Sequence, residues 1–382
     1  MPARDIELKI YNDYSTSPGV LLDDLSGEVT SLTWTTGLHG GFKRLTATVP
    51  MEASRIWLYL DREGFQGRHF KHVVVKERNE TRWEGRLMKA GIEWSGRSLA
   101  LQITALGYWS SMMDQRVTTV DYTGGSAATT DTIIKAMLTA KCPDINSDQT
   151  NINTAAGSRV LTLPVDTYAQ DHIINTLAPL GDTSQNTYYF AIWEDRIPYY
   201  AVRNTTLNWE TSLSELASGS LMQDANWLRN EADAFDGSTR SASAADSDSQ
   251  AFYPDRDAVV SVAAGVVSTA ATDARTRFIN ERKAPLQSSQ FVISGEVTRL
   301  SEFGMPSSTK SAIRAGDVIR INDLVPVTTT SAQSGTSDNL RVFHILETTY
   351  DAIRDRVTIV PNRPPSTLSK ILPRLGKIEP PS

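Results

Sequence analysis

The chain has 382 residues, a net charge of −6 and a single cysteine, Cys142. Its length predicts two to four domains, and its 40% hydrophobic content excludes wholesale disorder. One cysteine excludes a disulfide framework within the chain and is interpreted as a small buried apolar residue. The absence of a Lys/Arg block argues against sequence-specific nucleic-acid binding.

The N-terminal stretch MPARDIELKI has no basic region followed by an apolar one. No run in the chain reaches about 18 consecutive apolar residues. We therefore expect no secretion signal and no membrane span, and a chain that folds in the cytoplasm.

The first 110 residues predict a small antiparallel β domain. In LTATV (45–49) and LALQITAL (99–106), apolar and polar residues alternate, as in a half-buried strand. HFKHVVVKE (69–77) is a further strand, and tight turns are expected at 78–81 and 94–97. Short strands joined by tight turns indicate a sandwich or a barrel.

Residues 111–207 predict a compact α+β unit. A helix over residues 131–141 has Ile133, Ile134, Met137 and Leu138 on one face, with Thr130 as its N-cap. A second helix begins at Thr167, where Thr167 and Gln170 have capping-box spacing, and ends at Pro179 and Gly181. Strands follow in YYFAIWEDRIPYYAVR (188–203), with a bend at Asp195 and Arg196.

Residues 208–285 have the weakest pattern. Residues 227–235 fit a strand or a short helix, and DGSTRSASAADSDS (236–249) predicts a polar loop. Val267, Ala271, Ala274 and Phe278 lie at helical spacing, with Ser268 as a cap and Pro285 as a stop. They predict a helix of about 16 residues.

Strands return after residue 286. They are expected in FVISGEVTRL (291–300), DVIRI (317–321), VFHILETTYD (342–351) and RVTIV (356–360), with a polar loop at 326–340. The proline-rich C-terminal tail is expected to fray.

One short motif occurs twice in the chain. SGEVTSL (26–32) and SGEVTRL (294–300) agree at six of seven positions, and both chance and an internal duplication account for this pair. We interpret both copies as strands, preceded by strand candidates at residues 6–11 and 227–235. Two related β-barrels would then lie in one chain.

The fold class is therefore mainly β with α+β: two small antiparallel β-barrel domains plus smaller α+β domains. The predicted domains are a first β-barrel (1–110), an α+β domain (111–207), a second β-barrel (208–240 and 286–366) with an inserted helical segment (241–285), and a C-terminal tail (367–382).

The sequence offers no catalytic, cofactor-binding or metal-binding residues. His69 and His72 have H-x-x-H spacing, but positions three apart on a strand face opposite ways. His39, His172 and His344 are isolated. The four aspartates 246, 248, 255 and 257 fail the EF-hand pattern, and the segment from Gly40 to Lys43 lacks a phosphate-loop spacing. We expect a protein that is not an enzyme.

Five stretches that together cover most of the chain carry a resemblance to a known family. They are VTSLTWTTGLHGGFKRLTATVP (29–50), EGRLMKAGIEWSGRSLALQITALGYWSSM (84–112), DTYAQDHIINTLAPLGDTSQNTYYFAIWEDR (166–196), IRAGDVIRINDL (313–324) and FHILETTYDAIRDRVTIVPNRPPSTLSKILPRL (343–375). The chain resembles the tail hub, or baseplate hub, proteins of tailed bacteriophages.

The resemblance implies a homotrimeric ring in the virion tail, assembled in the host cytoplasm. Each subunit would contribute two similar barrels, so that six barrels continue the six-fold tail tube. The ring would join the tail tube or distal tail protein to the tip, spike or fibre protein, hold the tape-measure protein, and let DNA pass through its lumen.

Other functions remain alternatives from the sequence alone. They are the hub of a phage-derived injection or gene-transfer particle, a cell-wall-degrading tail enzyme, and a carbohydrate-binding adhesin.

Overall fold

The computed structural model describes most of the chain. The described residues are 6–12, 19–52, 55, 59, 71–95, 98–117, 121–122, 128–155, 157, 161–163, 166–178, 188–204, 206–235, 240–251, 253–261, 268–283, 286–300, 309–324 and 341–361. His69, Pro179, Gly181, the polar loop at 326–340 and the C-terminal tail lie outside them. No helix within these ranges is long and apolar enough to cross a membrane.

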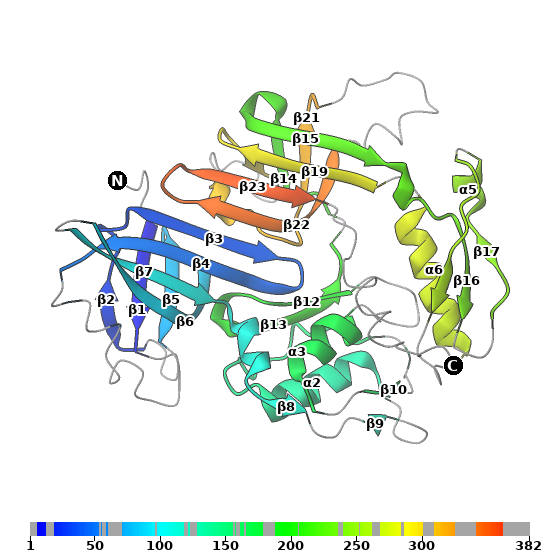
Figure 1. Ribbon diagram of the computed structural model, residues 1–382, viewed down its shortest axis with the longest axis horizontal. Coiled ribbons are helices and arrows are strands. Elements are labelled where there is room, and N and C mark those ends of the chain that lie inside the picture. The colour runs from blue at the N-terminus through cyan, green and yellow to red at the C-terminus, as the bar shows by residue number, and fades with distance from the viewer. Residues whose placement is uncertain are drawn as a thin grey trace.

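Strands dominate the structure, so the mainly-β class with added α+β parts is confirmed (Figure 1). The largest sheet follows the order β15-β19-β23-β22-β3-β4-β7-β6-β5-β1-β2. Among the described residues this path is open at β15 and at β2. The two closed barrels expected from the sequence are therefore not seen as closed there; related units of one continuous sheet stand in their place.

The N-terminal strands are β1 (Ile6–Tyr11), β2 (Leu21–Asp24), β3 (Ser31–Gly37), β4 (Gly40–Pro50), β5 (His72–Glu77), β6 (Glu80–Ser95) and β7 (Ser98–Leu106). The C-terminal strands of the same sheet are β14 (Trp209–Ser212), β15 (Leu216–Asp224), β19 (Leu286–Ile293), β20 (Thr298–Arg299), β21 (Val318–Asn322), β22 (Val342–Asp351) and β23 (Arg356–Pro361).

Alternating residues place these strands as the sequence predicts. In β1, Ile6, Leu8 and Ile10 are buried and the intervening residues are half-buried. The turn between β5 and β6 consists of Arg78 and Asn79, whose φ angles of 50° and 67° suit a two-residue hairpin loop.

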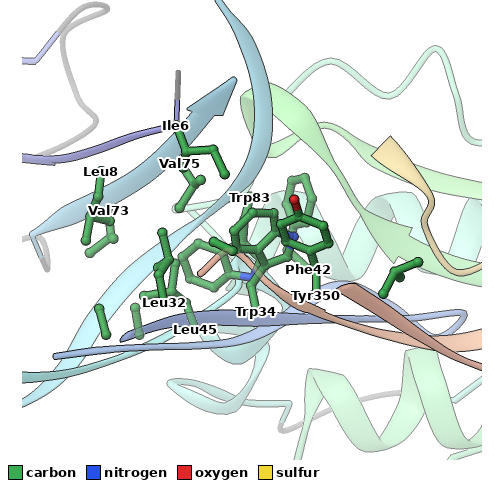
Figure 2. Close-up of a cluster of buried hydrophobic side chains, with 14 of the residues drawn as sticks. Ile6, Leu8, Leu32, Trp34, Phe42, Leu45, Val73, Val75, Trp83 and Tyr350 are labelled. Atoms are coloured by element: carbon green, nitrogen blue, oxygen red, sulfur yellow. The ribbon is translucent and has the colours of Figure 1, made fainter. Parts of the chain in front are cut away.

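A hydrophobic core runs through both halves of the large sheet. Figure 2 shows Trp34, Phe42, Trp83 and Tyr350 gathered at its centre. The rings of Trp34 on β3 and Tyr350 on β22 lie 4.6 Å apart between centroids. Residues more than 300 positions apart in sequence therefore fill one core.

The middle of the chain forms a separate cluster of helices and short strands. Its elements are β8 (Arg116–Val117), β9 (Asp121–Tyr122), α2 (Thr130–Lys141), β10 (Leu161–Thr162), β11 (Thr167–Tyr168), α3 (Ala169–His172) followed by a π turn (Ile173–Leu177), β12 (Tyr188–Ile192) and β13 (Pro198–Val202). The apolar face expected for the first helix is buried in this cluster. The expected bend is also present, because Asp195 and Arg196 both have positive φ angles.

Both helix starts differ from the sequence prediction. The N-cap of α2 is Thr129, one residue earlier than expected, and Thr130 is a buried first-turn residue. The second helix begins at Ala169 because Thr167 pairs in β11 with β8. The Oγ1 atom of Thr167 lies 2.6 Å from Nε2 of His172, so this hydroxyl contacts a ring instead of capping a helix.

Residues 228–283 build a small third unit. A three-stranded sheet of β17 (Ala244–Ala245), β16 (Glu231–Phe235) and β18 (Val259–Ser261) packs against α6 (Ser268–Arg282) around Ala232, Val260, Phe278 and Ile279. The predicted long helix is confirmed. The strand within residues 227–235 belongs to this unit and not to the second half of the large sheet, which corrects the expectation. The predicted loop at 236–249 also contains β17 and the start of the short helix α5 (Ser247–Gln250).

Buried polar contacts attach the middle cluster to the large sheet. Arg86 on β6 is fully buried, and its guanidinium donates to Ser110 Oγ at 3.0 Å and Asp144 Oδ2 at 3.3 Å. Glu84 on the same strand is also buried, and its Oε1 accepts the backbone N–H of Arg196 at 2.7 Å. Burial raises the pKa of Glu84 to about 8, and Asp195 and Glu194 add to the rise.

Glu84→Gln is expected to remove one component of the pH dependence of stability. Between about pH 4.5 and 8 the Glu84 carboxyl holds a proton in the folded state and loses it on unfolding. The free energy of unfolding therefore falls as pH rises through this window, by up to about 1.4 kcal/mol per pH unit. Glutamine keeps an acceptor oxygen for Arg196 and does not titrate. Denaturant melts from pH 5 to pH 9 should show a flatter profile for the variant, with its largest gain at high pH.

Glu93→Gln, on the exposed end of β6, is the matched control and should keep the wild-type profile. An unchanged profile in Glu84→Gln would contradict the assignment.

Candidate functional site

The two halves of the large sheet have the same internal connectivity. The first unit consists of β3, β4, β5, β6 and β7, and the second of β15, β19, β21, β22 and β23. In both, the order of strands across the sheet is first, second, fifth, fourth, third, and every adjacent pair is antiparallel. We call these the first and second five-strand units.

The two units have the same register irregularity in their fourth strand. β6 has a bulge between Leu87 and Lys89 against β7, and β22 has a bulge between Ile345 and Glu347 against β23. In both units the third strand pairs before the bulge, with Arg86 in one case and His344 in the other. A bulge at the same point of the same strand indicates one module present twice.

The repeated SGEVT motif does not mark equivalent positions in these units. The first copy is a turn that precedes β3, whereas the second follows β19 and reaches the short strand β20. The expectation that both copies are strands is wrong for most of each motif. By register, the counterparts of Ser31 and Leu32 in the second unit are instead Ser218 and Gly219. Two related units are present, but this motif is not their trace.

The two units join edge to edge through β22 and β3. After its bulge, β22 pairs residues 347–351 with residues 33–37 of β3. The pairing extends beyond the strand ends, because the N–H of Leu38 donates to Leu346 at 2.8 Å and that of Ala352 donates to Leu32 at 2.9 Å. We call this contact the internal junction.

A buried hydroxyl pair lies at the centre of the internal junction. Thr36 Oγ1 and Thr348 Oγ1 are 2.7 Å apart, and Thr36 Oγ1 also accepts the N–H of Ala315 at 2.8 Å. All three residues are buried. Three separate strands and loops therefore depend on one threonine side chain.

The charged groups beside the junction are strongly desolvated. Burial lowers the pKa of Lys43 to about 8, against the opposing effect of Glu347. The Lys43 ammonium lies 4.7 Å from the centre of the Trp109 ring. Burial also lowers the pKa of His39 and of His344 to about 4, so both rings are neutral at pH 7.

The other two described histidines have local partners. His72 lies on β5, where its Nδ1 is 2.7 Å from the Tyr108 hydroxyl and burial lowers its pKa to about 4. His172 contacts Thr167 in the middle cluster. Across the described part of the chain, no group of three or more His, Cys, Asp or Glu residues could hold a metal ion.

The remaining candidate positions have structural contacts. Asp246 caps α5 by accepting the N–H of Ser249 at 2.9 Å, and it pairs with Lys283 at 3.0 Å. Gly41 has a φ of 78°, and a Cβ there would lie 2.1 Å from the carbonyl oxygen of Ile192, because β12 pairs directly with β4 at this point. Cys142 is buried, as expected for a small apolar residue.

The sequence prediction missed two strands in the second half of the large sheet. β14 and β15 contain WETS and LASGSLMQD, in which small and polar residues obscure the alternation. The junction was missed as well, because it joins segments more than 300 positions apart. The matching bulges in β6 and β22 reveal the relation between the two units. They are features of the backbone register, so residue types alone do not show them.

Three solved structures are similar to this chain over nearly their full length. A tail protein from Neisseria meningitidis superposes with a TM-score of 0.61 at 9% identity, covering 94% of this chain and 96% of that one. The 43 kDa tail protein of prophage MuSo2 from Shewanella oneidensis gives 0.60 at 10% identity, with 95% and 99% covered.

The prophage tail protein gp18 from Listeria monocytogenes gives a TM-score of 0.55 at 10% identity, with 97% of this chain and 99% of that chain covered. The chain has the fold of bacteriophage tail proteins. No family model and no curated protein sequence matches it. The resemblance inferred from the sequence is therefore confirmed through the tail-protein fold.

Thr36→Val is expected to destabilise the tail-protein fold by about 1–3 kcal/mol, because it leaves the buried N–H of Ala315 without its acceptor. Thr348→Val removes the hydroxyl pair but leaves Thr36 to accept from Ala315, and should cost about 1 kcal/mol. Urea unfolding of both variants measures the difference. Equal losses in the two variants would show that the Ala315 contact does not hold the junction.

Proposed function

We propose that this chain is a structural tail hub that works as a homotrimeric ring. One observation carries the proposal: a single chain contains two five-strand units with identical strand order, joined edge to edge. Three such chains present six similar units, which is what equivalent contact with a six-fold tube requires.

The fold shared with phage tail proteins supports a place in the virion tail. In that position the ring would join the tail tube or distal tail protein to the tip, spike or fibre protein. It would also hold the end of the tape-measure protein and leave a lumen for DNA. The net charge of −6 suits a lumen that lets DNA pass without binding it.

The ring is expected to form from the purified chain. Native mass spectrometry should give a species of three times 42.0 kDa, and class averages from electron microscopy should show an open ring with six lobes. A chain that stays monomeric over the whole concentration range accessible to sedimentation would contradict the proposal, and so would a ring of another number.

The proposal also assigns the chain no catalytic activity, since binding surfaces alone account for a hub. Purified protein incubated with bacterial cell walls should release no soluble fragments. Clearing of the walls would overturn this part and favour a tail enzyme.

A further inference from the structure

We propose that neighbouring copies of this chain join by antiparallel pairing of residues 89–95 on β6 of one copy with β15 of the next. We call this contact the intersubunit seam. It rests on the proposed function, because its partner is a second copy of the same chain. It goes further by assigning the strand edges, their direction and their register.

The internal junction supplies the template for the seam. There, the bulged fourth strand of the second unit pairs with the first strand of the first unit. The counterparts of these two strands are β6 and β15. Among the described residues, residues 89–95 pair only with β7, and β15 pairs only with β19. The edges of β22 and β3 therefore pair within the chain, whereas the equivalent edges of β6 and β15 have no strand partner among the described residues.

Within the part of the chain that the structure describes, the β15 edge lacks the usual protection against pairing. Residues 217–223, with sequence ASGSLMQ, contain no charge and no proline, and residues 217–220 are exposed. Exposed edge strands commonly carry lysine, proline or a covering element to prevent association with another strand. An unprotected edge of this length is typical of a strand that pairs in the assembled state.

The β6 edge exposes an apolar face that its counterpart buries. Ile92 and Trp94 are 37% and 74% exposed, whereas the equivalent residues, Tyr350 on β22 and Ala352 directly after it, are each 2% exposed. The alternation of apolar and polar residues along this end of β6 is that of a half-buried strand. The missing cover on this face is what a neighbouring β15 would supply.

The register of the seam follows from that of the internal junction. Tyr350 lies opposite Trp34, and Asp351 lies opposite Thr33. Each residue of the junction is then replaced by its counterpart in the other unit. This gives three pairs of opposite residues in the seam: Glu93 with Ser220, Ile92 with Leu221, and Trp94 with Gly219.

This register is chemically favourable at several points. Ile92 and half-buried Leu221 form an apolar pair in place of Tyr350 and Trp34. The Trp94 ring would cover Gly219, an arrangement that compensates for the missing side chain of a glycine in a sheet. Further along the strands, the same register makes position 89, a lysine, opposite position 224, an aspartate.

The two edges lie on different parts of the molecule, β15 at the top of the view and β6 at its lower left (Figure 1). A contact between them is head-to-tail, so it produces a closed ring when the rotations at the junctions and the seams together complete one full turn. Six units related in this way belong to three chains.

Disulfide trapping tests the register directly. Glu93→Cys combined with Ser220→Cys should form an intermolecular bridge on mild oxidation, because opposite residues of a pair without mutual hydrogen bonds have Cα atoms about 4.5 Å apart. Thiols are blocked with N-ethylmaleimide before denaturation, and Cys142 is buried. Non-reducing gels should show covalent dimers and trimers, and mass spectrometry should identify the peptide pair containing residues 93 and 220.

Two further double variants serve as controls. Thr33→Cys with Asp351→Cys marks the equivalent position of the internal junction and should give a bridge within one chain only. Glu93→Cys with Ser214→Cys is out of register on an exposed position before β15, and should give at least about tenfold less intermolecular bridge.

Native mass spectrometry of the reduced variants separates the two proposals. Trimers in which Glu93 and Ser220 fail to bridge would overturn the seam and leave the ring intact. Absence of trimers in wild type and variants alike would overturn the ring. Trimers that bridge Glu93 and Ser214 as readily as Glu93 and Ser220 would overturn the register.

Discussion

The structure depends on one strand edge that is shared between two partners. β22 pairs along one side with β23, and along the other side first with β21 and then with β3. The bulge at Leu346 makes this division feasible, because a bulge bends the strand and increases its twist at the point where one partner leaves and the next begins. Without this change of partner, the two five-strand units would be separate sheets with separate cores. With it, Tyr350 of one unit packs on Trp34 of the other.

One turn of the middle cluster bridges the two halves of the large sheet. Residues 194–196 connect β12 to β13, with Asp195 and Arg196 in the left-handed region. The N–H of Arg196 donates to Glu84 in the first unit, while Glu194 accepts from Arg314 of the second half of the sheet at 2.9 Å. One turn therefore contacts both units, and its strained backbone is held by contacts on either side. The α+β cluster limits how the units can rotate about the internal junction.

Local structure was predictable where burial produces a regular pattern. The alternation in β1, β4 and β7, the turn at Arg78 and Asn79, and the apolar face of α2 all follow from side-chain periodicity. The start of α3 was not predictable from capping chemistry, since Thr167 is taken up by strand pairing with β8. β15 was missed because its small and polar residues give this strand no clear alternation.

The relation between the two units was inferred from the sequence for the wrong reason. SGEVT repeats at positions that are not equivalent, while the equivalent positions differ in residue type: Ile92 corresponds to Tyr350, and Leu221 to Trp34. Sheet pairing is made by main-chain groups, so the bulge and the register can persist while side chains diverge. The side chains at equivalent positions then differ according to the contact they make, the internal junction or the proposed seam. The internal junction forms once, during folding, and can enclose large aromatic rings and a buried threonine pair. A seam between copies has to form from chains that are already folded and dissolved. At the position where the internal junction has Tyr350 and Trp34, the proposed seam has the smaller Ile92 and Leu221, and the exposed ring of Trp94 is the large apolar group that assembly would cover.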